Sequence, residues 1–210
     1  MFIRTPTLCG ILAISALFAC RVNAQMTLTP TAVTAGFSLS TFATGFPSDG
    51  GVGPVGITFT PSGGVLVSNY GSGNLYRFAT DTDGQTLAMA SNSTFYGGRN
   101  LAGLATTGGK YYMVQQQSGQ VIQVNENTTF NHVVISGLNS PLGLVTNPAN
   151  GHLLASVNGS GKIIDVNPAT GVAADVITGL PDVDGISISA DGSVVFAAVR
   201  GNGQIGRAHV

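Results

Sequence analysis

Charged side chains are scarce in this sequence. Asp, Glu, Lys and Arg make up 8% of the 210 residues, whereas they make up about 25% of an ordinary soluble domain. Eight Lys and Arg residues are balanced by nine Asp and Glu residues, so the chain has no basic face and nucleic acid is not an expected partner. The composition also argues against a coiled coil or a helical bundle, which needs abundant Glu, Lys and Ala.

Cysteine is nearly absent as well. The two cysteines, Cys9 and Cys20, both lie within residues 1–24, which we interpret as a secretory signal peptide. Removal of this segment leaves a chain without thiols. Neither a disulfide framework nor a cysteine metal site is therefore expected in the mature protein.

The signal-peptide interpretation depends on three features. Arg4 supplies a positive start, residues 8–20 form an apolar run too short to span a bilayer, and Val22-Asn23-Ala24 is a small-x-small cleavage site. These features predict a protein that is secreted or periplasmic/extracellular and has no transmembrane segment. The alternative is a lipoprotein signal in which Cys20 carries the lipid.

Glycine, by contrast, is abundant, with 30 residues in no collagen-like triplet pattern. Four glycines, spaced 47, 40 and 42 residues apart, open similar segments: Pro54-Val55-Gly56-Ile57, Leu101-Ala102-Gly103-Leu104, Pro141-Leu142-Gly143-Leu144 and Val183-Asp184-Gly185-Ile186. Each copy continues with short apolar segments separated by turns. Four short strands in a period of about 40–45 residues are the signature of a β-propeller blade.

The predicted fold is therefore all-β, a β-propeller of four-stranded blades. Counting from Gly56 gives about three and a half blades, which we expect to form an open arc with the inner strands around one axis. The alternative is a closed four-bladed ring, in which residues 40–46 complete the fourth blade. A β-solenoid or a sandwich is less consistent with turn residues that repeat four times.

The chain divides into a signal peptide at 1–24, an N-terminal linker at 25–36, a partial β-propeller at 37–204 and a tail at 205–210. The tail is what read-through into a common sequencing adaptor would encode, so we interpret the propeller as C-terminally truncated. The alternative is a genuine third strand, because Ile205 falls where the third strands of the other copies begin. Residues 40–47 are similar to residues 175–181, a fourth strand that ends a blade.

The copies resemble the NHL-like and the senescence-marker/gluconolactonase-like propellers. The resemblance rests on the Pro-x-Gly-[Ile/Leu] starts, on the Asn150-Gly151 and Asp191-Gly192 hairpins and on residues 165–171. It covers most of residues 37–204 and specifies the superfamily better than the subfamily. The resemblance implies a propeller that closes with six blades, or sometimes with five or seven.

Candidate ligand-binding residues lie in the loops at one end of the blades. The loops that enter inner strands and the turns after second strands share one face of a propeller, where ligands usually bind. The candidates on this face are Arg99, Asn100, Gln116, Asn158, Asp184 and Arg200. They predict a polar small molecule, a glycan or a protein as partner. The alternative interpretation is that these turns are polar only because they contact water.

The gluconolactonase-like resemblance implies one divalent cation, such as Ca²⁺, held on the axis by Glu, Asn and Asp near the starts of inner strands. Of the four residues that precede the start glycines, only Asp184 has a metal-binding side chain. It is a weak metal candidate, so we expect no cofactor in this chain, although a full-length relative would bind a cation.

Two classes of function follow. The first is a secreted or periplasmic propeller that acts as a non-catalytic binding or scaffold module. The second is a fragment of a metal-dependent lactonase, or of an enzyme like streptogramin lyase, whose active site lies largely in missing blades. The sequence favours the first class and leaves enzymatic activity open, because no catalytic set of side chains is apparent.

Overall fold

The computed structural model describes residues 27–97 and 100–209, which belong to two compact units, Met1–Leu39 and Ser40–Val210. In the first unit, α1 (Pro30–Thr34) is a single short helix whose N-cap residue Thr29 accepts a hydrogen bond from the Ala32 backbone N–H. The predicted signal peptide at 1–24 lies outside the described residues. In the described part of the chain, no helix has both the length and the apolar character needed to cross a bilayer.

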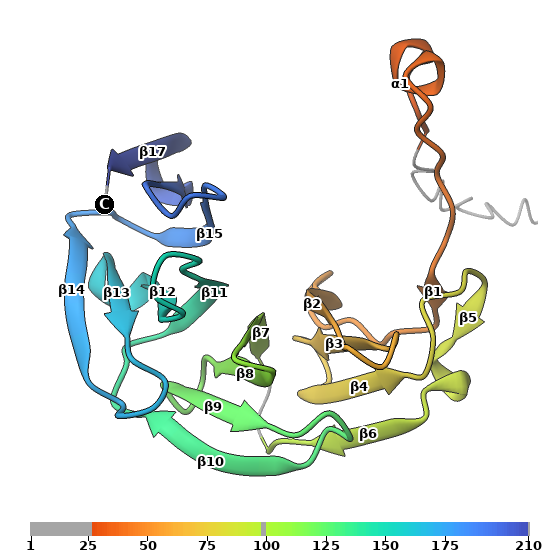
Figure 1. Cartoon of the computed structure of the whole chain (residues 1–210), viewed down its shortest axis with the longest axis horizontal. Coiled ribbons are helices and arrows are strands. Elements are labelled where there is room, and N and C mark those ends of the chain that lie inside the picture. Colours follow the sequence, from red (N-terminus) through yellow and green to blue (C-terminus); the bar gives the residue numbers. More distant parts are fainter. Residues whose placement is uncertain (1–26, 98–99, 210) are drawn as a thin grey trace, which may run out of the picture. The chain divides into compact units, whose positions relative to one another are not determined.

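The second unit contains four small antiparallel sheets arranged as propeller blades (Figure 1), besides one short parallel pair of strands. Blade 1 contains β2 (Pro54–Phe59), β3 (Val65–Asn69), β4 (Asn74–Phe78) and β6 (Asn92–Phe95). Blade 2 contains β7 (Leu101–Thr107), β8 (Lys110–Gln115), β9 (Gln120–Val124) and β10 (Phe130–Ile135). Blade 3 contains β11 (Pro141–Thr146), β12 (Leu153–Val157), β13 (Lys162–Val166) and β14 (Ala173–Thr178), and blade 4 contains β15 (Val183–Ile188), β16 (Val194–Val199) and β17 (Gln204–His209). The all-β propeller prediction is confirmed, and the count of four blades is the one that the four-bladed alternative expects.

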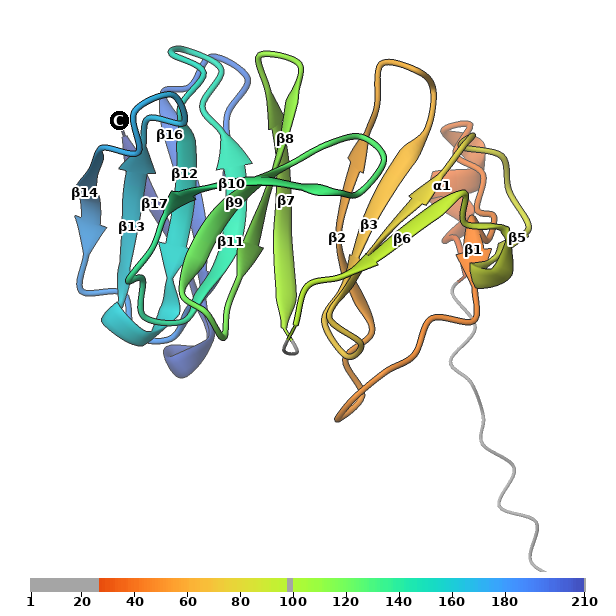
Figure 2. The same ribbon diagram turned by 90° about the horizontal axis from the view of Figure 1, so that it is seen from below.

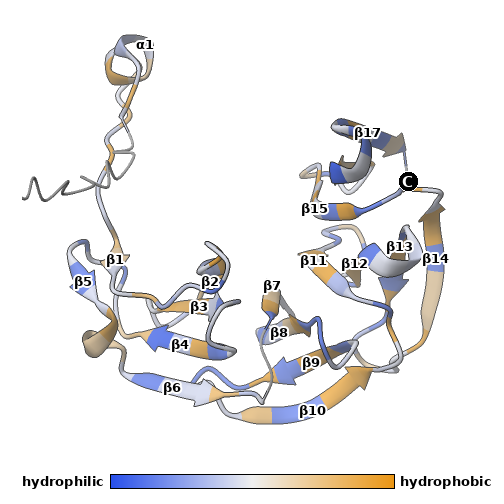
Figure 3. Ribbon diagram, turned by 180° about the vertical axis from the view of Figure 1, so that it is seen from behind, coloured by the Kyte–Doolittle hydropathy of each residue, from blue (hydrophilic) through white to orange (hydrophobic). Residues whose placement is uncertain are grey.

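The sequence pattern explains which strands lie inside. The second strands β3 and β12 are buried along their whole length, whereas the fourth strands β10 and β14 are largely exposed. In Figure 3, the buried strand β3 is largely hydrophobic and the outer strand β6 is largely hydrophilic. The turns that follow β12 and β16 end in Gly161 and Gly203, whose φ angles of 60° and 65° favour glycine.

The start glycines set the packing between blades. A Cβ added at Gly56 would lie 2.5 Å from the carbonyl oxygen of Ala102 on β7, and one at Gly103 would lie 2.5 Å from the backbone nitrogen of Leu144 on β11. A Cβ added at Gly143 would lie 2.8 Å from the carbonyl oxygen of Asp184 on β15. The inner strands thus pack in the order β2, β7, β11, β15 (Figures 1 and 2), as the repeat predicts.

Residues 40–46 pack on blade 1. Their strand β1 (Ala43–Thr44) pairs in parallel with β5 (Gln85–Thr86), which leads into the 3-10 helix η1 (Leu87–Met89). The Phe42 ring lies 5.2 Å from that of Phe78, and the Phe46 ring lies 5.8 Å from that of Tyr76. In the four-bladed alternative this segment completes the fourth blade, but here β1 pairs with β5 and not with β17.

The last strand lies where the third strand of a blade is expected. Strand β17 pairs with β16 along its whole length, from Gln204 opposite Val199 to His209 opposite Val194. This is the position that β13 occupies in blade 3. The adaptor origin assigned to residues 205–210 stays a prediction.

Candidate functional site

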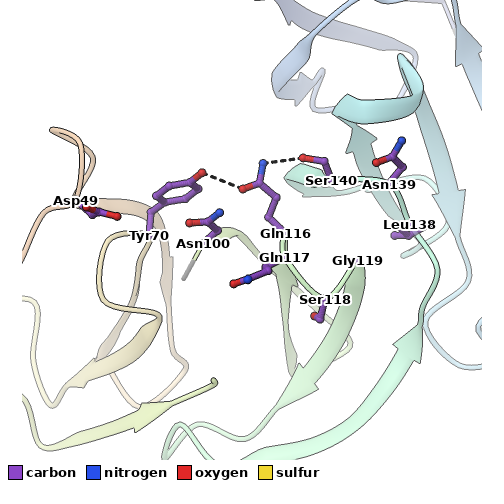
Figure 4. A pocket seen from close by; sticks show the side chains of 10 residues that line it. All are labelled: Asp49, Tyr70, Asn100, Gln116, Gln117, Ser118, Gly119, Leu138, Asn139 and Ser140. Atoms are coloured by element: carbon purple, nitrogen blue, oxygen red, sulfur yellow. Dashed lines mark hydrogen bonds between the residues drawn. The ribbon is translucent and has the colours of Figure 1, made fainter. Parts of the chain in front are cut away.

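Equivalent turn residues reach from each blade to the next at one end of the second unit, the lower end in Figure 2. Tyr70 follows β3 and donates its phenol hydrogen to Gln116 Oε1 at 2.9 Å, and Gln116 follows β8 and donates from Nε2 to Ser140 Oγ at 2.8 Å. Figure 4 shows this chain of two hydrogen bonds across blades 1 to 3. The polar turn residues of neighbouring blades thus bind one another in this region.

The same pattern continues between blades 3 and 4. Asn158, at the start of η2 (Asn158–Ser160), donates from Nδ2 to Asp182 Oδ1 at 2.8 Å and to the Val183 carbonyl oxygen at 3.0 Å. Arg200, at the start of η3 (Arg200–Asn202), donates from Nε and Nη2 to the Asp182 carboxylate, at 3.2 Å in each case. These contacts fix the last two turns of the face in position.

Ion pairing shifts the proton affinities of both partners at this end of blade 4. The hydrogen bond from Arg200, and then the one from Asn158, hold the pKa of Asp182 below its usual value. Asp182 in turn raises the pKa of Arg200, and the charge of Asp184 adds to this shift. Both side chains are charged at neutral pH, so they form an ion pair at the surface.

A broad cavity of about 800 Å³ opens beside the turns of blades 1 to 3 (Figure 4). Its lining residues are polar apart from a few, and they are Asp49, Tyr70, Asn100, Gln116, Gln117, Ser118, Gly119, Leu138, Asn139 and Ser140. Carboxamides and hydroxyls dominate, and Asp49 is the only carboxylate among these lining residues. Such a surface offers many neutral hydrogen-bond donors and acceptors to a ligand.

A second cavity of about 300 Å³ lies between the inner strands. It takes its lining from all four blades: Val52, Val55, Tyr70, Ala102, Gly103, Gln116, Leu142, Gly143, Asp184, Gly185 and Arg200. Tyr70 and Gln116 line both cavities, so they connect the axis with the broad outer cavity.

The predicted site residues separate into three groups. Asn100 and Gln116 line the broad cavity, and Gln116, Asp184 and Arg200 line the axial one. Asn158 lines neither of them, because its amide binds Asp182 and Val183. Arg99 lies outside the described residues.

The prediction missed Gln117 and Ser118, which also line the broad cavity. They follow Gln116 directly and precede the turn glycine Gly119. The available signal was the uninterrupted run of polar side chains before the turn glycine, because the position of Gln117 is a glycine in the equivalent turns of the other blades (Gly71, Gly159 and Gly201).

Asp184 was the weak metal candidate, and it lies beside a cation. Its carboxylate oxygen Oδ2 is 3.8 Å from Arg200 Nη1. Among residues 27–97 and 100–209, no three His, Cys, Asp or Glu side chains lie close enough together to hold a metal ion. Because Arg200 already supplies the positive charge beside Asp184, a second cation there would be repelled.

Comparison with known proteins establishes the fold. No protein-family model and no curated protein sequence matches the chain. Among solved structures, it is similar to a chain of the nidogen/laminin complex, with a TM-score of 0.61 and 17% identity over 74% of this chain and 60% of that one. It is also similar to catalytically inactive virginiamycin B lyase from Staphylococcus aureus with quinupristin, with a TM-score of 0.53 and 13% identity over 79% of this chain and 58% of that one.

A third similar structure is covered by this chain almost completely. The computationally designed Ika4 protein matches with a TM-score of 0.57 and 11% identity over 82% of this chain and 99% of that one. The chain therefore spans about three fifths of the two natural proteins named above and nearly all of the designed one. At these identities the similarity concerns the fold alone, and that fold is a β-propeller.

Proposed function

We propose that this chain is an extracytoplasmic, non-catalytic binding module that takes an uncharged polar ligand, such as a glycan, in the broad cavity. The observation that supports this proposal is the lining of that cavity. It combines the carboxamides of Asn100, Gln116 and Gln117 with the hydroxyls of Tyr70 and Ser140. Amides and hydroxyls both donate and accept hydrogen bonds, so they complement the adjacent hydroxyls of a sugar.

The cavity is also preorganised. Gln116 is held on both sides, by Tyr70 and by Ser140, so little side-chain freedom is lost when a ligand contacts it. Blades 1 to 3 each contribute part of the wall through the turns and loops that connect their strands.

Titration with a panel of neutral mono-, di- and trisaccharides, followed by NMR of the labelled protein, tests the proposal. We expect shifts for the backbone amides of residues 116–119 and 138–140. The Gln117→Ala variant should weaken binding about tenfold, which corresponds to one lost hydrogen bond of about 1.4 kcal/mol. The control is Asn131→Ala, an exposed amide on the outer strand β10, which should bind as the wild type does. Saccharides that bind both variants equally, or none that bind at all, would contradict the proposal.

The extracytoplasmic location is part of the same proposal and depends on residues 1–24. N-terminal sequencing of the exported protein should begin at Gln25. A protein that starts at a lipidated Cys20 would instead support the lipoprotein alternative, and one that retains Met1 would contradict both.

The enzymatic alternative, a fragment of a metal-dependent lactonase or of an enzyme like streptogramin lyase, has less support. It needs acidic residues or a histidine at the inner-strand starts, where the described chain offers Asp184 beside Arg200. The histidines lie elsewhere. In blade 3, His152 Nδ1 lies 2.6 Å from Asp165 Oδ1, and in blade 2, His132 contacts Asn131 on the outer strand β10. The NHL-like or senescence-marker/gluconolactonase-like assignment likewise rests on the Pro-x-Gly starts and is part of the proposal.

A further inference from the structure

Two carboxamides of the broad cavity have no partner in the protein, and both belong to blade 2, which has a neighbouring blade on each side. They are Asn100 and Gln117, and neither forms a side-chain hydrogen bond with another residue in the part of the chain that the structure describes. The hydroxyls of Tyr70 and Ser140 are, by contrast, both bound to Gln116. A free carboxamide offers two N–H donors and a carbonyl acceptor to a ligand.

The Asn100 side chain is free because of the tyrosine on blade 1. Asn100 and Ser140 have the same place in their blades, directly before the inner strand and with positive φ angles of 85° and 56°. Gln116, the turn residue of the preceding blade, binds the Ser140 side chain. Tyr70 is the turn residue that precedes Asn100, but its phenol group binds Gln116 Oε1 instead. In the view of Figure 4, the Asn100 side chain lies between those of Tyr70 and Gln117.

Backbone hydrogen bonds hold Asn100 in place on both sides. Its N–H donates to the Tyr70 carbonyl oxygen at 2.9 Å, and its carbonyl oxygen accepts from the Gln116 N–H at 3.0 Å. A positive φ angle is unfavourable for most side chains, although asparagine tolerates it better than most. The fold therefore keeps at this strained position a residue whose amide it does not use, which is typical of a binding site.

Gln117 occupies a position at which the other blades carry glycine. The equivalent residues are Gly71, Gly159 and Gly201. A Cβ added at Gly159 would lie 2.5 Å from Asn139 Oδ1, and one added at Gly71 would lie 2.6 Å from the backbone nitrogen of Asp49. In blades 1 and 3, the loop before the inner strand thus fills the space that a side chain would need. In blade 2 the same position carries an exposed carboxamide that lines the broad cavity.

A pair of free carboxamides complements a secondary amide. The N–H and the C=O of such an amide point in opposite directions, so they need an acceptor on one side and a donor on the other. Each carboxamide can supply either group. A ligand hydroxyl can donate or accept, as water does, so it gains less by replacing water here. The Tyr70 ring and Leu138 add apolar surface to the same lining, which a methyl group next to the amide would cover.

We propose that Asn100 and Gln117 bind the acetamido group of an N-acetylated sugar. One carboxamide accepts a hydrogen bond from the acetamido N–H, the other donates to its carbonyl oxygen, and the methyl group lies against the Tyr70 ring. Gln116 and Ser140 keep their mutual hydrogen bond and act as positioning residues. This inference rests on the proposed function, because it names the class of neutral glycan that the broad cavity binds.

Two matched disaccharides test the acetamido group. Cellobiose and N,N′-diacetylchitobiose have the same linkage, and the second carries acetamido groups in place of the hydroxyls beside the anomeric carbons. In calorimetric titrations we expect diacetylchitobiose to bind about tenfold more tightly. Asn100→Gly keeps a residue that adopts positive φ and should bind both disaccharides alike. Asn202→Gly, at an exposed carboxamide of blade 4 that lines neither cavity, should keep the preference.

A second measurement uses the wild-type protein, so it decides the question even if Asn100→Gly is less stable. Nuclear Overhauser effects should connect the acetyl methyl group with the side-chain amide protons of Asn100 and Gln117. Cellobiose binding as tightly as diacetylchitobiose or more tightly, an unchanged preference in Asn100→Gly, or effects to other side chains only would overturn this inference and leave the proposed function intact. If no neutral saccharide binds, the proposed function fails and this inference fails with it.

Discussion

Single glycines determine how closely neighbouring blades approach. At Gly56, Gly103 and Gly143, the backbone of the next inner strand occupies the space that a side chain would need. The contact is with backbone atoms and not with the end of a flexible side chain, so the neighbour cannot move aside without moving a whole strand.

We expect Gly103→Ala to destabilise the second unit by about 1–3 kcal/mol, because the added methyl group overlaps the backbone of β11. Gly185→Ala is the matched control. A Cβ at Gly185 would meet no atom of the described residues within 4 Å, so the free energy of unfolding of this variant should stay within about 0.5 kcal/mol of that of the wild type. Urea unfolding of both variants measures the difference. Equal losses would mean that glycine is needed for strand conformation and not for blade contact.

Glu126, in the turn after β9 of blade 2, contacts a turn and strand β4 of blade 1. Its carboxylate accepts hydrogen bonds from the Ser62 hydroxyl and from Arg77 Nη2, the latter at 2.8 Å. These two hydrogen bonds, that of Ser62 first, hold the pKa of Glu126 below its usual value of 4.5.

Because folding lowers this pKa, ionised Glu126 contributes stability that is complete above pH 4.5 and is lost as the pH falls through the folded-state value. We expect Glu126→Gln to lower the free energy of unfolding by about 0.5–1 kcal/mol at pH 7. The difference from the wild type should close as the pH falls through the lowered folded-state pKa of Glu126, because the carboxyl group then becomes neutral like the amide. Thermal unfolding between pH 3 and pH 7 measures it. Asp81→Asn, at an exposed carboxylate outside this cluster, should show no such convergence.

At the level of elements, residues 40–46 act as a cover for blade 1. Phe42 and Phe46 are half-buried and pack edge to face on Phe78 and Tyr76. Together with Leu87 and Ala90, they shield the side chains of Val65 and Val67 from water.

Replacing both rings, as Phe42→Ala with Phe46→Ala, should cost roughly 2–4 kcal/mol of stability, because each removes a half-buried ring and an aromatic pair. Chemical unfolding followed by tyrosine fluorescence measures this loss. Phe37→Ala, at a ring that is 67% exposed in the first unit, serves as the control and should be neutral. If the double variant is as stable as this control, residues 40–46 are a loosely attached arm.

The position of this segment was only partly predictable. Its similarity to residues 175–181 suggested a fourth strand. Phe42 and Phe46 pack against the cluster of blade 1, as Val176 in β14 and Leu180 just after it pack against the cluster that blade 4 shares with blade 3. Its pairing with β5 was not predictable, because a two-residue parallel bridge leaves no pattern in the sequence. Local pairing of this kind depends on the path of the loop and not on residue type.

For the whole molecule, the period of the repeat carried most of the predictable information. The start glycines located every inner strand, and the polar residues before the turn glycines located the loop face. The lining of the two cavities was not predictable from the sequence. Gln117 lines one of them, whereas Asn158 lines neither and binds Asp182 and Val183 instead. Which polar side chains bind one another and which face a ligand is decided by distances between blades.

Coupling between blades is confined to neighbours, and this gives a test over the whole unit. The Gly143 backbone N–H donates to Ser156 Oγ at 2.7 Å, and Ser156 Oγ donates to the Asp184 carbonyl oxygen at 2.6 Å, which joins blades 3 and 4. Ser156→Ala leaves both backbone groups without this partner and should cost about 1–3 kcal/mol.

The loss should appear locally, as in other repeat proteins. Hydrogen exchange should speed up in β15 and β16 and remain at the wild-type rate in β3 and β4. Ser68→Ala should do the reverse, because Ser68 Oγ donates to the Ala102 carbonyl oxygen between blades 1 and 2. Uniform acceleration in both variants would show that the four blades open as one cooperative unit.

The glycine contacts between blades also constrain how such a gene can change in length. Gly103, Gly143 and Gly185 are 40 and 42 residues apart, and each of the first two meets the inner strand that begins the next copy. An in-frame duplication or deletion of one whole copy keeps a glycine opposite every neighbouring inner strand. One of half a copy would bring an outer strand to the axis and leave a side chain where the backbone must fit. Unequal recombination within this gene can therefore yield folded products only in steps of one blade.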